Sequence, residues 1–143
     1  VAVTGVQTCA LPISVGATNH RPVEPTVAYL LSDDPASVVL GGDGIPCATL
    51  DDLCRGAGAY VQTVLRDDLV KLIPNKRFLD ILDYHSTVEQ AAQTAQRAGV
   101  SKLILTHYVP SMQPGQEDEW RAIAARHFSG EIVLGDDLTT TSI

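Results

Sequence analysis

Short apolar runs alternate with helical patterns along this chain, and this alternation constrains its fold more than any other feature. Residues 86–99 place alanine and valine side chains on one face at helical spacing, and a buried strand pattern follows at 102–106. A second helix is predicted over 116–128, before a strand that begins at 131 and runs to 134. Strands that alternate with helices indicate an α/β architecture.

The first half of the chain adds further elements of the same kind. Strands are predicted over 25–31, 37–40 and 59–65, and a short helix over 48–55. Two end signals frame the clearest helix, 86–99. Ser86 with Glu89 three residues later predicts a capping box, and Gly99 predicts the helix end.

Composition narrows the class of protein. The chain has 143 residues, which suits one domain or part of a larger one, and it contains no apolar run of about 20 residues that could span a membrane. Ten Lys and Arg against 17 Asp and Glu give a net charge of −7, which argues against a nucleic-acid partner. Three cysteines argue against a disulfide scaffold and predict a reducing, cytoplasmic location.

The first fourteen residues differ from the rest. They carry no charge and have no clean helical or strand period, and the stretch VTGVQTCALPIS resembles one translated frame of a sequencing-adapter oligonucleotide. We interpret residues 1–14 as an artefact and exclude them from fold reasoning. Residues 15–143 then form the native part, with Cys47 and Cys54 as its only cysteines.

Histidine and aspartate side chains stand beside the predicted strand and helix ends. His107 follows the strand at 102–106, Asp43 follows the strand at 37–40, His85 precedes a helix, and His20 precedes a strand. Sites form at strand ends in α/β sheets because the loops there converge, and imidazole and carboxylate groups are good zinc ligands. The residues alone leave an alternative open, in which the three histidines and Asp43 are ordinary loop and helix-entry residues bonded to backbone or solvent.

Four segments resemble motifs of the metallo-β-lactamase superfamily, in the right order. Val38–Cys47 resembles the strand-GDT-x-P-C segment, and Tyr84–Thr87 resembles the HST motif of the ribonuclease Z-like branch. Leu103–Tyr108 resembles the final LxLxHF strand, and Asn19–Pro22 resembles the earlier histidine before a strand. The joint resemblance covers about residues 18 to 140.

The resemblance implies a dizinc hydrolase and a role for each motif residue. His20 would bind one zinc ion, Asp43 would bridge two, and His107 would bind the second. His85 would lie beside the substrate, to contact an anionic oxygen or help proton transfer. A metal-bound hydroxide would attack an ester or phosphodiester-type centre of a small-molecule or phosphodiester substrate.

Three departures from the family pattern shape the prediction. The family's first ligand cluster, HxHxDH, is absent from these residues. We therefore expect the C-terminal half of an αββα sandwich, inactive alone, with one sheet and two covering helices, the N-terminal half being missing. Gln62 and Thr63 stand where ribonuclease Z has the His and Glu of its HEAT motif, and Gly44 replaces a threonine.

Gln62 and Thr63, together with the acidic net charge, favour a hydrolase with a smaller substrate over a tRNA 3′-processing ribonuclease Z. That nuclease is kept as one alternative. A non-catalytic α/β binding module without metal is the other. A homodimer is left open. An uncovered half-sandwich should expose apolar sheet surface and aggregate.

Overall fold

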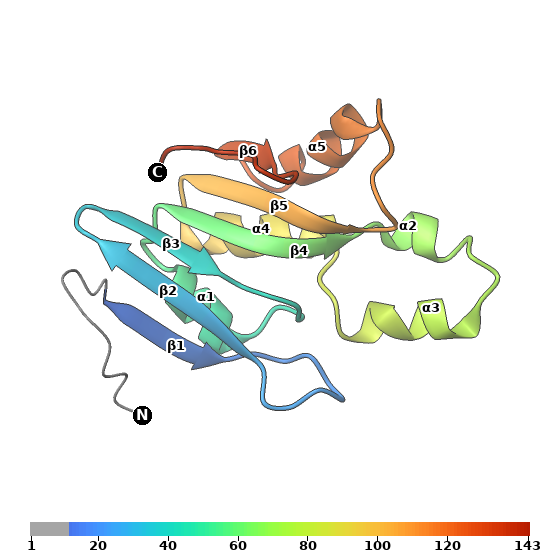
Figure 1. Ribbon diagram of the computed structural model, residues 1–143, viewed down its shortest axis with the longest axis horizontal. Helices are drawn as coiled ribbons and strands as arrows, with labels where there is room; N and C mark the ends of the chain where they lie inside the picture. Colours follow the sequence, from blue (N-terminus) through green and yellow to red (C-terminus); the bar gives the residue numbers. More distant parts are fainter. Residues whose placement is uncertain (1–11) are drawn as a thin grey trace.

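The structure, a computed structural model, describes residues 12–143, so most of the 1–14 segment lies outside the described part. Its core is one six-stranded sheet in the order β1-β2-β3-β4-β5-β6 (Figure 1). Neighbours β1, β2 and β3 pair antiparallel, whereas β3, β4, β5 and β6 pair parallel. The strands are β1 (Ile13–Ala17), β2 (Val27–Asp33), β3 (Ala36–Leu40), β4 (Ala59–Leu65), β5 (Lys102–Val109) and β6 (Glu131–Leu134).

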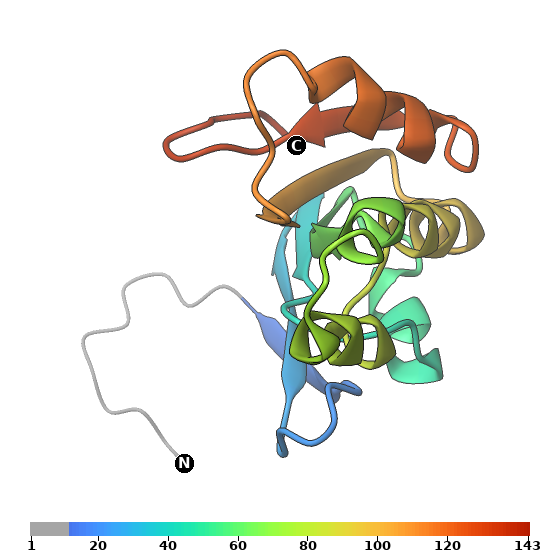
Figure 2. The same cartoon turned by 90° about the vertical axis from the view of Figure 1, so that its right-hand side faces the viewer.

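Helices gather on one side of this sheet (Figure 2). The helices are α1 (Ala48–Cys54), α2 (Asp67–Val70), α3 (Lys76–Asp80), the 3-10 turn η1 (Ile81–Asp83), α4 (Val88–Ala98) and α5 (Glu117–Ala125). Three of them, α1, α4 and α5, pack beside one another and against the strands. Two covering helices were predicted, but three cover the sheet in the described residues, because α1 also packs against it through its buried Leu50 and Cys54.

One face of the sheet forms the core. A row of side chains runs across neighbouring strands from Leu30 through Val39, Tyr60 and Leu103 to Ile132. Val39, Tyr60 and Leu103 are fully or almost fully buried beneath the helices. Adjacent side chains of a strand point to opposite faces, so the next row lies on the other side. That row runs through Val15, Tyr29, Leu40, Val61, Ile104 and Val133.

The second row lies on a face without covering helices in the described residues. Val15 is 57%, Tyr29 42% and Leu40 41% exposed. The C-terminal residues cover part of this face, where the Lys102 ammonium donates to the Thr141 hydroxyl at 2.7 Å. The rest is an apolar surface, as expected of a sheet from a sandwich.

Local signals explain where α4 begins and ends. The capping box is formed by Thr87 and Gln90, whose side chains each bond to the other residue's backbone N–H at 3.1 and 2.9 Å. The prediction of Ser86 with Glu89 is therefore wrong by one residue. Ser86 is buried and points elsewhere, toward the loop after β3. Gly99 ends the helix with a φ of 71°, as predicted.

The chain makes an excursion between β4 and α4 that holds α2, α3 and η1 (Figure 1). In the described residues, no helix is long and apolar enough to cross a membrane.

Candidate metal centre

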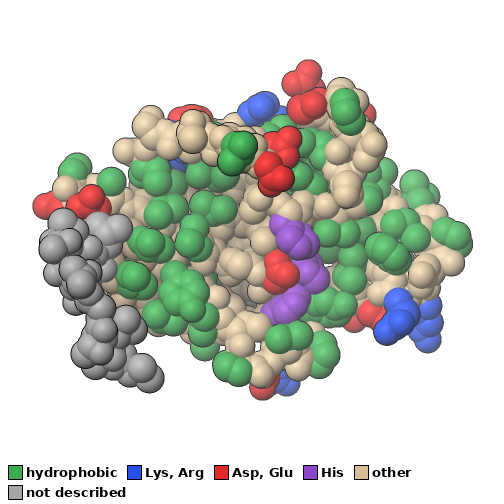
Figure 3. Space-filling view, viewed as in Figure 1, with side chains coloured by type: hydrophobic (Ala, Val, Ile, Leu, Met, Phe, Trp, Pro, Cys, Tyr) green, Lys and Arg blue, Asp and Glu red, His purple; other side chains and the backbone are tan. Residues whose placement is uncertain are grey.

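Three segments far apart in the sequence bring a carboxylate and two imidazoles together. His20 lies between β1 and β2, Asp43 lies after β3, and His85 lies just before α4. One ligand atom from each of these residues lies within 4.8 Å of those of the other two. On the open face of the sheet, histidine side chains gather beside an acidic side chain (Figure 3). The motif residues thus meet at the edge where the parallel strands end.

His20 has one ring nitrogen committed and one free for a ligand. Its Nδ1 lies 2.8 Å from the carbonyl oxygen of Tyr84. A carbonyl oxygen only accepts, so Nδ1 carries the proton and Nε2 keeps its lone pair. Metal-binding histidines commonly donate their other nitrogen in this way, which fixes the tautomer and the ring orientation.

His85 is packed tightly against both partners. Its Nε2 lies 3.7 Å from Oδ2 of Asp43, and its ring meets that of His20 edge-on with centroids 4.7 Å apart. Burial lowers the pKa of His85, and the carboxylate of Asp43 opposes this shift only in part. Its Nδ1 is buried without a hydrogen-bond partner. The imidazole therefore favours its neutral form, in which it can bind a metal or accept a proton.

Hydrogen bonds hold the loop that carries Asp43. The buried Ser86 hydroxyl donates to the carbonyl of Gly44 at 2.6 Å, and the Ile45 amide donates to the carbonyl of Asn19 at 2.9 Å. These bonds join the three segments that contribute His20, Asp43 and His85. Asn19 and Tyr84 lie in motifs that the sequence shows, but the roles of their carbonyls could not be predicted, because a side-chain pattern does not indicate which carbonyl faces a site.

His107 is outside this set of three, although it is near enough for its charge to act on the pKa of His85. It is not among the three residues whose ligand atoms lie within 4.8 Å of one another. It is exposed and has a left-handed φ of 49°, which is uncommon for a residue other than glycine. The pairing of β5 with β4 gains one residue here, since Thr63 pairs with Thr106 but Leu65 pairs with Val109. Such a bulge re-aims a side chain at the end of a strand.

A cavity of about 780 Å³ adjoins His107. Phe78 of α3 and Met112 supply apolar walls, and Asp136 lines the side beyond β6. The structure therefore brings together His20, Asp43 and His85 and leaves His107 at a neighbouring hollow. The assignment of His20, Asp43 and His107 as ligands and of His85 as the catalytic residue stays a prediction.

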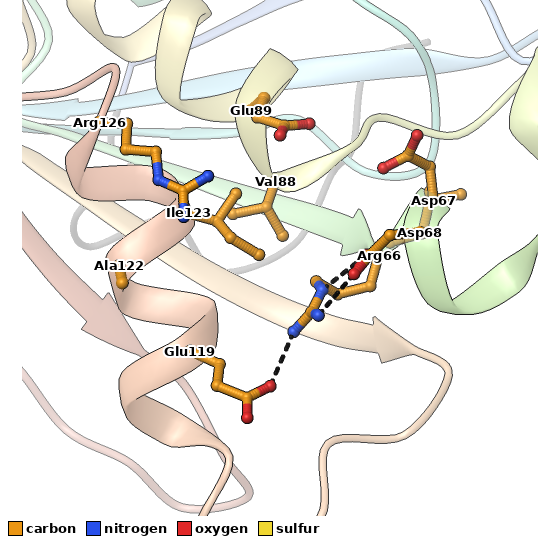
Figure 4. Close-up of a pocket in the computed structure, with 10 residues that line it drawn as sticks. Arg66, Asp67, Asp68, Val88, Glu89, Glu119, Ala122, Ile123 and Arg126 are labelled. Carbon is orange, nitrogen blue, oxygen red and sulfur yellow. Dashed lines mark hydrogen bonds and ion pairs between the residues drawn. The ribbon is translucent and has the colours of Figure 1, made fainter.

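A second cavity, of about 450 Å³, lies away from the histidines between α2, α4 and α5 (Figure 4). The Arg66 guanidinium holds Asp68 with two bonds of 2.6 and 2.7 Å and reaches Glu119 at 3.3 Å. None of the described residues that line it is a histidine or cysteine. The guanidinium of Arg66 is already paired with two carboxylates, so its charge is engaged within the protein.

The donor set of the histidine cluster fits a zinc ion. His20 and Asp43 offer an imidazole and a carboxylate, which are typical zinc ligands, and the imidazole of His85 lies beside them.

Comparison with known proteins supports the family predicted from the motifs. A ribonuclease Z from Mycolicibacterium gilvum is 60% identical over 126 residues, which are 88% of this chain and 44% of that protein. A ribonuclease Z from Mycobacterium tuberculosis is 56% identical over 88% of this chain and 46% of its own length. The chain therefore spans less than half the length of these curated relatives. No family model matches it.

Solved structures share the fold. A metallo-β-lactamase fold protein from Bacillus subtilis matches with a TM-score of 0.67 and 23% identity, over 86% of this chain and 45% of that chain. Human tRNase Z, short form, matches with a TM-score of 0.61 and 20% identity, over 92% of this chain and 41% of that chain.

The likeness to nucleases conflicts with the expectation, drawn from net charge, that nucleic acid is not a partner. Net charge over the chain is a poor guide here because it says nothing about where the cations lie. The fold and the relatives agree with the four motifs. The chain is similar to the ribonuclease Z-like branch of the metallo-β-lactamase superfamily and has that superfamily's fold over the part that it covers.

Proposed function

We propose that the full-length protein is a zinc-dependent phosphodiesterase that cleaves RNA. One observation carries the proposal: His20, Asp43 and His85 present ligand atoms within 4.8 Å of one another, in a chain 56–60% identical to proteins named ribonuclease Z. The same observation weighs against the non-catalytic module, which has no use for a cluster of metal ligands. The smaller-substrate alternative rests only on Gln62, Thr63 and the net charge.

Three residues of this chain would bind metal. His20 and Asp43 would hold one zinc ion, Asp43 would bridge to a second, and His107 would bind that second ion. The HxHxDH cluster that the family carries upstream would complete both sites. Zinc, when bound, lowers the pKa of water to about 7 and polarises the attacked centre. We expect the 143 residues alone, which lack that cluster, to be inactive.

His85 would act on the substrate rather than hold the metal. Burial keeps its imidazole neutral, and its Nε2 faces the carboxylate of Asp43. In that form Nε2 can accept a proton or, once protonated, contact an anionic phosphate oxygen. The hydrogen bond from the His85 amide to the carbonyl of Ile81, at 3.1 Å, fixes the backbone from which the ring extends.

Replacing Asp43 by alanine in the full-length protein tests the proposal. The bridging carboxylate is lost, so we expect the variant to lose bound zinc and phosphodiesterase activity together. Zinc is measured by elemental analysis after dialysis. Asp52→Ala is a matched control, because Asp52 is an exposed aspartate on α1 that pairs with Arg55 at 3.0 Å, far from the cluster. Retained zinc with normal turnover in Asp43→Ala would overturn the proposal.

Two substrates separate the remaining alternatives in the same assay. A tRNA precursor with a 3′ extension tests the nuclease, and bis(p-nitrophenyl) phosphate tests hydrolysis of a small diester. Cleavage of the precursor supports the proposal. Turnover of the small diester alone supports the smaller-substrate hydrolase, and a wild-type protein without zinc supports the binding module.

A further inference from the structure

The carbonyl oxygen of Gly42, the residue before Asp43, is held by two side chains of β4. The Gln62 amide donates to it from Nε2 at 2.9 Å, and the Thr63 hydroxyl donates at 3.0 Å. A carbonyl oxygen has two lone pairs, so the two donors use both of them. We call Gln62 and Thr63 the Gly42 clamp. The clamp and the Ser86 bond to Gly44 grip the chain on both sides of Asp43.

The clamp is oriented by its own neighbours. Gln62 is 1% exposed, and the Tyr60 hydroxyl donates to its Oε1 at 2.6 Å. The carbonyls of Gly42 and Thr63 can only accept, so the end of the amide that faces them is Nε2 and the other end is the oxygen. The second hydrogen of Nε2 goes to the carbonyl of Thr63 at 3.1 Å. Every polar atom of the Gln62 side chain is therefore satisfied, which is what makes a buried polar network rigid.

Two further features fit the clamp. Gly42 has a φ of 66°, a conformation that a glycine adopts without strain. A Cβ atom at Gly41 would collide with Oε1 of Gln62 and would lie 2.9 Å from Cε2 of Tyr60. Glycine at 41 therefore lets the long Gln62 side chain reach past β3 to the Gly42 carbonyl.

We propose that Gln62 and Thr63 are positioning residues that fix Asp43 in the orientation needed to bind metal. The inference rests on the proposed metal site. Sequence analysis treated these two residues as the loss of an ionisable pair. Their contacts give them a different task, because both are neutral donors to the backbone of the loop that carries Asp43. Partners that orient metal ligands in this way typically change metal affinity about 10- to 100-fold when mutated.

Three variants of the full-length protein test this role. Thr63→Val and Gln62→Leu each remove a donor at nearly constant volume, and Thr63→Ser keeps the hydroxyl. We expect zinc affinity to fall about 10-fold in Thr63→Val, about 10- to 100-fold in Gln62→Leu, and to stay at the wild-type level in Thr63→Ser. The visible absorption of the cobalt-substituted proteins should change in the first two variants only. Ser37→Ala removes a hydroxyl that accepts from the Gly58 amide at 3.1 Å, away from the loop, and serves as control.

A second readout does not depend on metal. In the metal-free proteins, amide hydrogen exchange over residues 41–46 should speed up in Thr63→Val and Gln62→Leu and stay unchanged in Thr63→Ser. Unchanged exchange in the first two variants would overturn the clamp, and so would unchanged zinc affinity with faster exchange. A wild-type protein that takes up no zinc would instead overturn the proposed function and, with it, the metal-binding purpose of the clamp.

Discussion

Two rows of side chains, one residue apart in every strand, face opposite ways across the same sheet. The row through Val39, Tyr60 and Leu103 lies beneath the helices and is nearly inaccessible to solvent. The row through Val15, Tyr29 and Leu40 is almost as apolar, yet its members at the β1 edge of the sheet are about half exposed. Apolar content therefore marks both faces as surfaces to be buried, and only the arrangement of helices distinguishes them.

The two faces of the sheet differ in how much of their cover comes from this chain. The helix-covered face has a complete core, closed at one end by Arg66 on Trp120 at 5.7 Å. Among the residues that the structure describes, the C-terminal ones are what covers the open face, where Thr141 meets Lys102 of β5 and Ile143 lies beside β2 and β3. In an αββα sandwich, a second sheet packs on that face. The second sheet expected from the sequence stays a prediction.

The largest expected effect comes from a matched pair of truncations, one in each row. Leu103→Ala removes fully buried methyl groups and should lower the free energy of unfolding by about 2–5 kcal/mol. Leu40→Ala removes the same atoms from a side chain that is already 41% exposed, and should cost less than about 1 kcal/mol. Urea denaturation followed by circular dichroism measures both. Equal losses would show that the two faces are equally buried in solution.

A smaller effect is expected from the cation that closes the covered face. The Arg66 side chain is 10% exposed, whereas those of Asp68 and Glu119 are 56% and 61% exposed. Solvent weakens these ion pairs, so Arg66→Ala should lower the free energy of unfolding by about 1–2 kcal/mol. The control is Arg55→Ala, which breaks an exposed pair with Asp52 and should change little. A loss of stability no larger than that of the control would mean that Arg66 does not stabilise the helix-covered face.

The smallest effect on stability, with a clear effect on association, is expected on the open face. Tyr29→Ser should change the free energy of unfolding by only about 0.5 kcal/mol, and it should reduce self-association and binding of the dye ANS. Light scattering over a concentration series measures the association. Leu138→Ser is the control, because Leu138 is 98% exposed but lies in a loop outside the sheet. An equal decrease of self-association in Leu138→Ser would show that the open face of the sheet is not where the molecules associate.

Most of the fold could be predicted from the sequence, because its elements carry their own local signals. The strand at 59–65 was predicted with the bounds of β4, and α1, α4, α5 and β6 were placed within a few residues. β1 was missed, since Ile13–Ala17 has no clear period and begins inside the segment interpreted as an artefact. α3 was missed because its side chains are exposed, so no buried face imposes a pattern on Lys76–Asp80.

The site could be predicted only as far as motif residues reveal it. His20, Asp43 and His85 were named from short motifs, and the structure brings them together. The Gly42 clamp could not be predicted, because it depends on the register of β4 against β3, which no local pattern reports. The left-handed backbone of His107 was equally hidden, since it follows from one extra residue in the pairing of β5.

The missing side chain at Gly41 also links two positions that are twenty-one apart in the sequence. Because a Cβ atom there would collide with Oε1 of Gln62, a side chain at 41 would displace the Gln62 amide from the Gly42 carbonyl. We therefore expect a side chain at 41 to fit best with a shorter residue at 62. The substitutions possible at positions 41 and 62 are thus limited by the space between the two residues.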